Sequence, residues 1–304
     1  MSSTPDDLDR HAAEWGVAPA LAALAESDAL SPPGALRDRL LRAAATEPPR
    51  LAEPAGPIEL YSNRVQAMQS LLATLPVDAW SRPALPYSWT VHGLVAHLLV
   101  IERYAAAAIG LRAMPDEPVD DHLAMGAATI AAELAGPPAA TAQRWFDETQ
   151  GIIAAVSAPG FDLAAPAPLH GWPFSASTSL VVRAFELWTH TDDIARAAGI
   201  ATAGTPAGEL RAMSSLSVGS LPFTLGSVAP GVEMAPARVV LTGSGGGTFD
   251  IGGPGERRAL VVADVVDYCR LVARRIEPQD LEMTVEGDAG FVHHLLRAAQ
   301  VFAM

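Results

Sequence analysis

Four polar side chains share one narrow stripe of a helix that the sequence predicts over residues 178–198. At 100° of rotation per residue, Arg183, Glu186, His190 and Asp193 project in nearly the same direction, and large apolar residues flank them on both sides. An exposed polar face would not be bordered in this way, so the stripe indicates buried polar groups that need partners. Glu186 and His190 are four residues apart, so they rise from adjacent turns and could converge on one metal ion.

A second predicted helix, over residues 90–111, offers a third ligand. His97 lies on its apolar face and therefore points toward the interior of the domain. A lone histidine in such a position is more often a core residue bonded to a carbonyl group, but here it can join Glu186 and His190. One carboxylate and two imidazoles suit zinc or another divalent first-row metal. Three protein ligands also leave a coordination position open for water or substrate, as catalytic sites do.

Two further residues have both a structural and a chemical interpretation. Asp193 follows His190 by three residues, so it could orient that imidazole through a hydrogen bond, or it could be an ordinary surface charge. Cys269, the single cysteine, could be a nucleophile, but its place in an apolar helical run favours a small buried residue. One cysteine excludes an intrachain disulfide and fits a reducing cytoplasm.

Helices must position these residues, and the pattern from Ile58 to about Gly199 is helical. Clusters of proline and glycine separate the candidate helices, which are 58–75, 90–111, 119–157 with a break at Pro137-Pro138, and 178–198. Four main helices joined in this way predict a four-helix bundle over residues 58–204.

The chain changes character on either side of this bundle. Residues 205–304 predict a small α+β domain, with helices near 205–217, 264–275 and 288–301 and strands at 238–242, 248–251 and 281–286. Residues 1–57 are alanine-rich and helical in pattern and end in a proline-rich linker, which predicts an N-terminal helical arm. The whole chain is therefore expected to be mainly α-helical.

The composition limits the partners. Half of the 304 residues are hydrophobic and 18% are charged, which is enough apolar surface for a sizeable core, while the formal net charge is −14. This acidic character disfavours a nucleic-acid partner or an anionic membrane surface, since both attract basic faces. No apolar run reaches the ~18 residues that cross a bilayer, and no apolar signal segment follows Met1. We expect a cytoplasmic protein that acts on a small molecule.

Three ordered segments resemble the mycothiol-dependent maleylpyruvate isomerases, a family of DinB-like proteins. Trp80 with the segment Tyr87–Leu98 is similar to the family's first metal-histidine motif, and Glu186–Ile194 is similar to its second, E-x-x-x-H-x-x-D-hydrophobic. Residues Leu271–Pro278 with Val285–Asp288 resemble the family's second domain. The resemblance covers about residues 58–304. It implies a DinB-like four-helix bundle followed by a small α+β domain.

The resemblance also implies a chemistry. It assigns the metal to His97, Glu186 and His190, and it places an arginine of the second domain at the active site, where Arg275 fits best and Arg274 is the alternative. Mycothiol would be the thiol cosubstrate. A metal-activated thiolate would attack a small electrophilic substrate, giving either an isomerase or an S-transferase, and the arginine would bind a substrate carboxylate.

This chain departs from the family pattern at two places. Residues 1–57 are additional, and their segment Ser31–Leu41 resembles the linkers of actinobacterial anti-sigma factors. Arg274 stands where the family often has glycine. Two other functions therefore stay open: a non-enzymatic, metal-binding regulatory protein, and a metal-assisted hydrolase with Asp193 as the general base. A fourth protein ligand at the metal would favour the regulatory protein.

Overall fold

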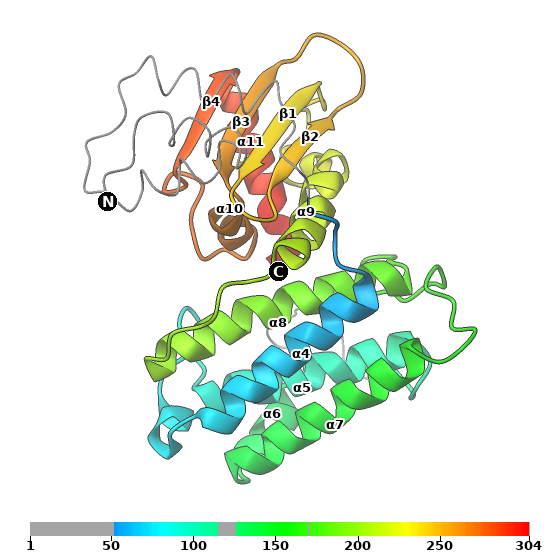
Figure 1. The fold of residues 1–304 in the computed structure, drawn as a ribbon, viewed down its shortest axis with the longest axis vertical. Helices are drawn as coiled ribbons and strands as arrows, with labels where there is room; N and C mark the ends of the chain where they lie inside the picture. The colour runs from blue at the N-terminus through cyan, green and yellow to red at the C-terminus, as the bar shows by residue number, and fades with distance from the viewer. Residues whose placement is uncertain (1–51, 115–125, 170, 304) are drawn as a thin grey trace, which may run out of the picture. The chain divides into compact units, whose positions relative to one another are not determined.

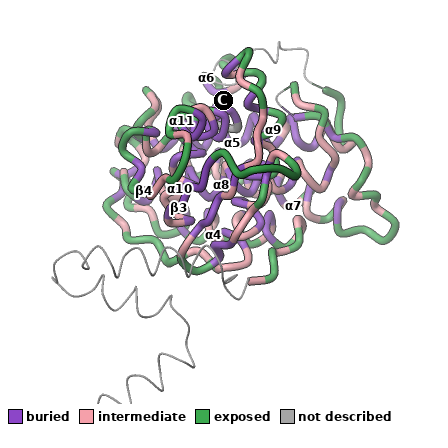
Figure 2. The backbone as a smooth tube through the Cα atoms, turned by 90° about the horizontal axis from the view of Figure 1, so that it is seen from above, coloured by how far each residue is buried: buried purple, intermediate pink, exposed green. Residues whose placement is uncertain are grey.

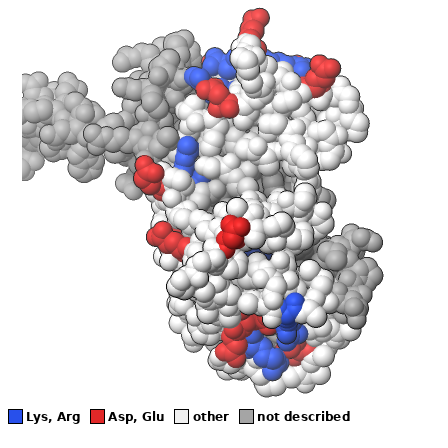
Figure 3. Space-filling view, turned by 90° about the vertical axis from the view of Figure 1, so that its right-hand side faces the viewer, with Lys and Arg blue, Asp and Glu red and all other residues white. Residues whose placement is uncertain are grey.

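The computed structural model describes residues 52–114, 126–169 and 171–303. They form two compact units, a helical one over residues 55–205 and one of mixed helices and strands over residues 206–301 (Figure 1). Nearly all of the predicted N-terminal arm lies outside the described residues. On the face that Figure 3 shows, charged side chains are sparse and both signs occur. None of the described helices combines the length and the apolar character that crossing a membrane would require.

Four long helices build the first unit: α4 (Pro57–Thr74), α5 (Val91–Ala108), α7 (Pro138–Val156) and α8 (Ala176–Ala198). Helix α4 packs against α7 and α8, and α5 packs against the same two helices, so the four form a bundle. The 3-10 helix η1 (Val77–Ser81) and the short α6 (Ala127–Leu134) complete the unit. Buried stretches, purple in Figure 2, run along the bundle helices.

Local chemistry sets the ends of α5 and α8, the two helices that carry the candidate ligands. At the start of α5 the Thr90 hydroxyl accepts a hydrogen bond from the Gly93 amide. At the start of α8 the Ser175 hydroxyl accepts one from the Thr178 amide. The chain leaves α8 at Gly199, whose left-handed φ of 70° suits a residue without a Cβ. These caps fix where each helix begins or ends, and therefore which turn carries each ligand.

The second unit begins with α9 (Ala207–Val228) and contains a four-stranded sheet of order β2-β1-β3-β4. The strands are β1 (Ala237–Thr242), β2 (Gly247–Ile251), β3 (Ala259–Asp264) and β4 (Met283–Gly287). Strands β1 and β3 run parallel, and each edge strand is antiparallel to its neighbour. The remaining helices are α10 (Val265–Val272), α11 (Ala289–Ala299) and the 3-10 helix η2 (Gln300–Ala303).

The predicted fold class is confirmed, because the chain is mainly helical, with a four-helix bundle and a small C-terminal sheet. The break at Pro137-Pro138 is also confirmed, since Pro138 begins α7, where its missing N–H costs nothing. Residues 119–125 of the same predicted helix lie outside the described ranges. The bundle therefore has the main helices that the sequence pattern predicts.

Two elements of the second unit differ from the expectation. Strand β3 was not predicted, because it is a central strand with nearly every residue buried and therefore lacks the alternation that marks a half-exposed strand. The helix expected near 205–217 is wrong in length, since α9 continues to Val228 through Pro222. Packing against α10 and α11 outweighs the weak helix propensity of its glycine, serine and proline residues.

Helix α10 ends three residues before the predicted boundary at residue 275. The chain turns at Arg274, which has a left-handed φ of 55°. The Arg274 amide donates to the Leu271 carbonyl (2.9 Å) and the Arg275 amide to the Arg270 carbonyl (2.7 Å), a Schellman motif. A side chain in this left-handed region costs about 1–2 kcal/mol. That cost explains why glycine is the favoured residue at such a turn.

Candidate metal centre

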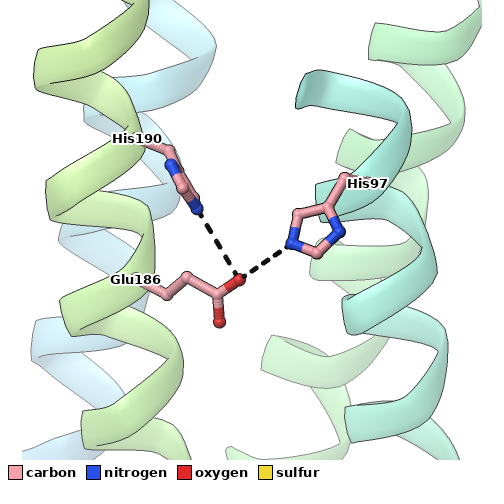
Figure 4. Close-up of side chains that lie close together, drawn as sticks. All are labelled: His97, Glu186 and His190. Atoms are coloured by element: carbon pink, nitrogen blue, oxygen red, sulfur yellow. Dashed lines mark ion pairs between the residues drawn. The ribbon is translucent and has the colours of Figure 1, made fainter. Parts of the chain in front are cut away.

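Three side chains from α5 and α8 meet inside the bundle (Figure 4). His97 Nε2 lies 3.5 Å from Glu186 Oε1, and His190 Nε2 lies 3.8 Å from the same oxygen. One ligand atom of each residue lies within 4.8 Å of the other two. Metal bonds of about 2.0–2.2 Å would place such atoms on the order of 3–4 Å apart. The three donors are therefore spaced to share one ion.

Burial and chemistry of the donors both fit a metal. The exposed fraction is 1% for the His97 side chain, 4% for His190 and 14% for Glu186. Within the described ranges, no other group of three or more histidine, cysteine, aspartate or glutamate residues is spaced to share one ion. Two imidazoles and one carboxylate suit zinc or another first-row metal and leave at least one coordination position to a non-protein ligand.

The Asp193 carboxylate lies beside His190 and is fully buried. Its Oδ2 is 3.0 Å from His190 Nδ1, and its Oδ1 is 3.7 Å from Arg196 Nη1. Because an ionised carboxylate can only accept, this contact favours the tautomer of His190 with the proton on Nδ1. The lone pair of Nε2 then faces Glu186 Oε1. Asp193 thus contacts the ring edge opposite the candidate metal and not the solvent.

Two half-buried aromatic residues lie against the imidazoles. Trp89 stacks on His97 with ring centroids 4.6 Å apart, and Tyr87 meets His190 edge-on at 5.6 Å. A Cβ at Gly93 would come within 3.1 Å of the Trp89 Cβ, so glycine leaves room for the Trp89 side chain at this position. Both aromatic residues belong to the first metal-histidine motif, in which no contact was predicted for them. Their packing restricts how the two rings can turn.

A buried chain of polar groups runs behind Glu186. The Tyr61 hydroxyl donates to Glu102 Oε2 (2.7 Å), Arg183 Nη2 donates to Glu102 Oε1 (2.9 Å), and Arg183 Nη1 donates to Glu186 Oε2. Burial alone would lower the pKa of Arg183, but the Glu102 and Glu186 carboxylates raise it above its usual value. Burial and then Glu102 raise the pKa of Tyr61 well above its usual value. Arg183 is therefore a permanent cation beside the site.

A second buried histidine, His92, has a different environment five residues before His97. The Thr141 hydroxyl donates to Glu133 Oε2 (2.9 Å), so His92 Nε2, 2.9 Å from the same hydroxyl, is the donor to it. Glu133 in turn accepts from Arg144. Burial lowers the pKa of His92. These groups connect α5, α6 and α7 and leave His92 without a place among the candidate ligands.

Arg275 and Cys269 both belong to the second unit. Arg275 Nη1 donates to the Ala273 carbonyl (2.6 Å) where α10 ends, and Arg274 Nε donates to the Gln300 carbonyl (3.3 Å). Cys269 is fully buried, and burial raises the pKa of its thiol well above the usual value, which disfavours a thiolate nucleophile. Cys269 therefore has the environment of a small core residue.

Sequence comparison places the candidate ligands in a known type of domain. Residues 62–195 match the family described as the mycothiol maleylpyruvate isomerase N-terminal domain. Two uncharacterized proteins of Mycobacterium tuberculosis, from strains CDC 1551 / Oshkosh and ATCC 25618 / H37Rv, are similar over a longer range. Each is 29% identical over 249 residues, which is 78% of this chain and 91% of the relative. The family match over residues 62–195 includes all three candidate ligands.

Two crystal structures share the fold. The structure of the mycothiol-dependent maleylpyruvate isomerase gives a TM-score of 0.52 at 14% identity and covers 75% of this chain and 91% of that chain. A histidine-to-alanine mutant gives a TM-score of 0.53 with the same identity and coverage. The resemblance read from the sequence motifs is thus confirmed: residues 62–195 match the mycothiol maleylpyruvate isomerase N-terminal domain, and the chain has the fold of a mycothiol-dependent maleylpyruvate isomerase.

Proposed function

We propose that this chain is a metal-dependent enzyme that uses mycothiol as a thiol cosubstrate. His97, Glu186 and His190 bind a divalent metal, with zinc as the first candidate. The observation that carries the proposal is the convergence of these three side chains, while no fourth protein ligand joins them from the described residues. A site with three protein ligands keeps a position for an exogenous group, and a thiol needs such a position.

The reaction follows from the chemistry of a thiolate. When bound, a divalent metal favours the thiolate form of a thiol, whose pKa in water is about 8.5. The sulfur adds to an activated carbon–carbon double bond of the substrate, the resulting single bond rotates, and loss of the thiolate gives the other geometric isomer. If the sulfur–carbon bond is kept and a proton is taken up at the neighbouring carbon, the product is instead that of an S-transferase.

The protein's residues hold the ligands in position for this chemistry. Asp193 holds His190 with its Nε2 directed inward, and Trp89 covers one face of His97. Arg183 holds one oxygen of Glu186. Each candidate ligand therefore has a neighbour that restricts its rotation, which is what a catalytic metal site requires of the surrounding residues.

The two alternative functions make different demands on the site. A regulatory metal protein would be favoured by a fourth protein ligand, and the described residues supply three. A metal-assisted hydrolase needs a general base that faces the attacking water. The candidate for that base is Asp193, and its Oδ2 is directed at His190 Nδ1. Both observations favour the thiol-dependent enzyme.

The test of the proposal combines metal analysis and thiol titration of the same purified protein. We expect about one equivalent of divalent metal per chain. Mycothiol should raise the melting temperature, and chelation of the metal should abolish that rise. A cis alkene with a carboxylate beside the double bond is then assayed for mycothiol-dependent isomerisation. Metal-loaded protein that neither responds to mycothiol nor converts the alkene would overturn the enzymatic proposal and favour a regulatory role.

We further propose that Arg275 binds the substrate carboxylate. Lysine cannot reproduce the planar fork of arginine, so Arg275→Lys should keep its metal but lose about tenfold or more in kcat/KM. The matched control is Arg270→Lys, a change at another arginine near the end of α10 that pairs with Asp267. If Arg275 only caps the helix, its loss should cost roughly 0.3–1 kcal/mol of stability and leave turnover intact. That result would direct attention to Arg274.

A further inference from the structure

The two oxygens of the Glu186 carboxylate have different surroundings. Oε1 faces both imidazoles, at 3.5 Å from His97 Nε2 and 3.8 Å from His190 Nε2. Oε2 accepts a hydrogen bond from Arg183 Nη1 on the preceding turn of α8. A carboxylate with one oxygen committed to a guanidinium has only the other oxygen available to a metal. The asymmetry therefore bears directly on how Glu186 can act as a ligand.

We propose that Arg183 and Glu102 are positioning residues that restrict Glu186 to a single coordinating oxygen. The inference rests on the proposed metal site. A carboxylate that chelates through both oxygens would occupy an additional coordination position, and the pair prevents this. The position that remains is then available to the thiol and the substrate. Arg183 and Glu102 thus keep one coordination position available and also hold the Glu186 carboxylate in its orientation.

Glu102 prevents Arg183 from turning away. Its carboxylate is fully buried, and both oxygens are engaged, one by Tyr61 and the other by Arg183 Nη2. Displacing the guanidinium would leave a buried carboxylate without its counter-charge, which is strongly unfavourable. Arg183 itself is 1% exposed, so water cannot easily replace either partner. The direction of its Nη1 group is consequently fixed.

The same two helices carry the ligands and the positioning pair. His97 and Glu102 are on α5, and Glu186 and Arg183 are on α8, so the contact between these helices continues for a further turn beyond the site. The Arg183–Glu102 pair is electrically neutral, which leaves the single negative charge of Glu186 to the ligand set. The pair therefore sets the orientation of the ligand and adds no net charge.

The test replaces the buried polar chain with apolar residues of similar size. The variant Tyr61→Phe/Glu102→Leu/Arg183→Met removes the buried Arg183–Glu102 ion pair as a unit and leaves the Glu186 carboxylate to the metal; exchanging a buried ion pair for apolar residues often preserves folding. A matched control, Arg238→Leu/Asp250→Leu, removes an exposed arginine–carboxylate pair between β1 and β2. Wild type and both variants are loaded with Co²⁺. Zinc affinity is measured by competition with a chelator, and the visible absorption of Co²⁺ reports the coordination number.

We expect the apolar variant to bind zinc about 10- to 100-fold more weakly, as is typical when an outer partner of a ligand is lost. Its Co²⁺ absorption should weaken as Glu186 becomes free to use both oxygens, while the control matches wild type. If the apolar variant does not fold, Arg183→Lys serves instead, because lysine keeps the charge but cannot bridge two carboxylates as a planar fork, so the same two changes are expected.

Two negative outcomes have different meanings. Unchanged zinc affinity and an unchanged Co²⁺ spectrum in a folded variant would overturn the positioning role and leave the metal site standing. Wild-type protein that binds neither Zn²⁺ nor Co²⁺ would overturn the metal site itself, and the positioning role with it. Neither readout depends on knowing the substrate.

Discussion

Helix α5 carries two buried histidines with opposite surroundings. His92 donates to Thr141, which donates to Glu133, so His92 Nε2 and the two groups that follow it are paired by protein groups of α6 and α7. His97, on the α8 side, has its Nε2 at 3.5 Å from Glu186, a distance that is too long for a good hydrogen bond. The polar groups around His92 are thus hydrogen-bonded to one another, whereas His97, Glu186 and His190 are spaced to hold an ion between them.

The comparison shows that burial alone does not distinguish a candidate metal ligand from an ordinary core histidine. Both imidazoles are on an apolar helix and both contact an aromatic ring, Trp80 in one case and Trp89 in the other. The difference lies in the opposing helix. Helix α7 offers a hydroxyl that can both donate and accept, whereas α8 offers a carboxylate and a second imidazole, which are a metal's preferred donors.

The largest expected effect is the loss of bound metal when a candidate ligand is replaced. His97→Ala and His190→Ala should each lose stoichiometric metal, because two remaining ligands bind a divalent ion weakly. His92→Ala, the control on the same helix, should keep one equivalent even if it is less stable. Metal content is measured by mass spectrometry after gel filtration. A full equivalent of zinc in His190→Ala would show that the ligand assignment is wrong.

A second pair of variants removes the partner of each histidine. Asp193→Ala should weaken metal binding by about 10- to 100-fold, because the His190 ring loses the group that orients it. Thr141→Val should leave metal affinity unchanged but cost about 1–3 kcal/mol of folding stability, because it leaves buried polar groups unsatisfied. Chelator competition and urea denaturation separate the two effects. Equal effects of the two variants on metal affinity would contradict the distinction.

The smallest expected effect is a pH dependence from His92. Burial lowers its pKa in the folded state, so the unfolded state takes up a proton first as the pH falls below the usual value of 6.5. The stability that neutral His92 contributes is present above that pH and is lost as the pH falls toward the folded pKa. In chelator-treated protein, His92→Gln should show a shallower loss of stability than wild type between about pH 7 and pH 5. Parallel profiles would contradict this.

The sequence predicts the convergence of the candidate ligands better than it predicts the contacts around them. The stripe on α8 follows from helical periodicity alone, and it brings Glu186 and His190 together as expected. The contacts of Glu102 with Tyr61 and Arg183 join three helices, so they depend on how the bundle packs, which one helix cannot reveal. The signal for Glu102 was present, because it is the one carboxylate of the mostly apolar helix α5.

Elements without periodicity were the hardest to predict. Strand β3 is apolar throughout, so nothing in its pattern separates it from a buried helix segment. The end of α10 was also predicted too late in the chain. Arg274 occupies the left-handed position of the turn, where a glycine would have indicated the end of the helix. Both errors lie in the second unit, where packing and turn geometry decide the structure more than sequence period does.

The position of the candidate ligands along the chain has a consequence for folding. His97 and Glu186 are separated by roughly 90 residues, so joining them closes a long loop whose entropic cost must be met before the site exists. Metal cannot gather these side chains early, as it can when the ligands are neighbours in sequence. The ion should therefore bind only after the bundle has assembled. Once bound, it would connect α5 to α8 and slow the unfolding of the bundle.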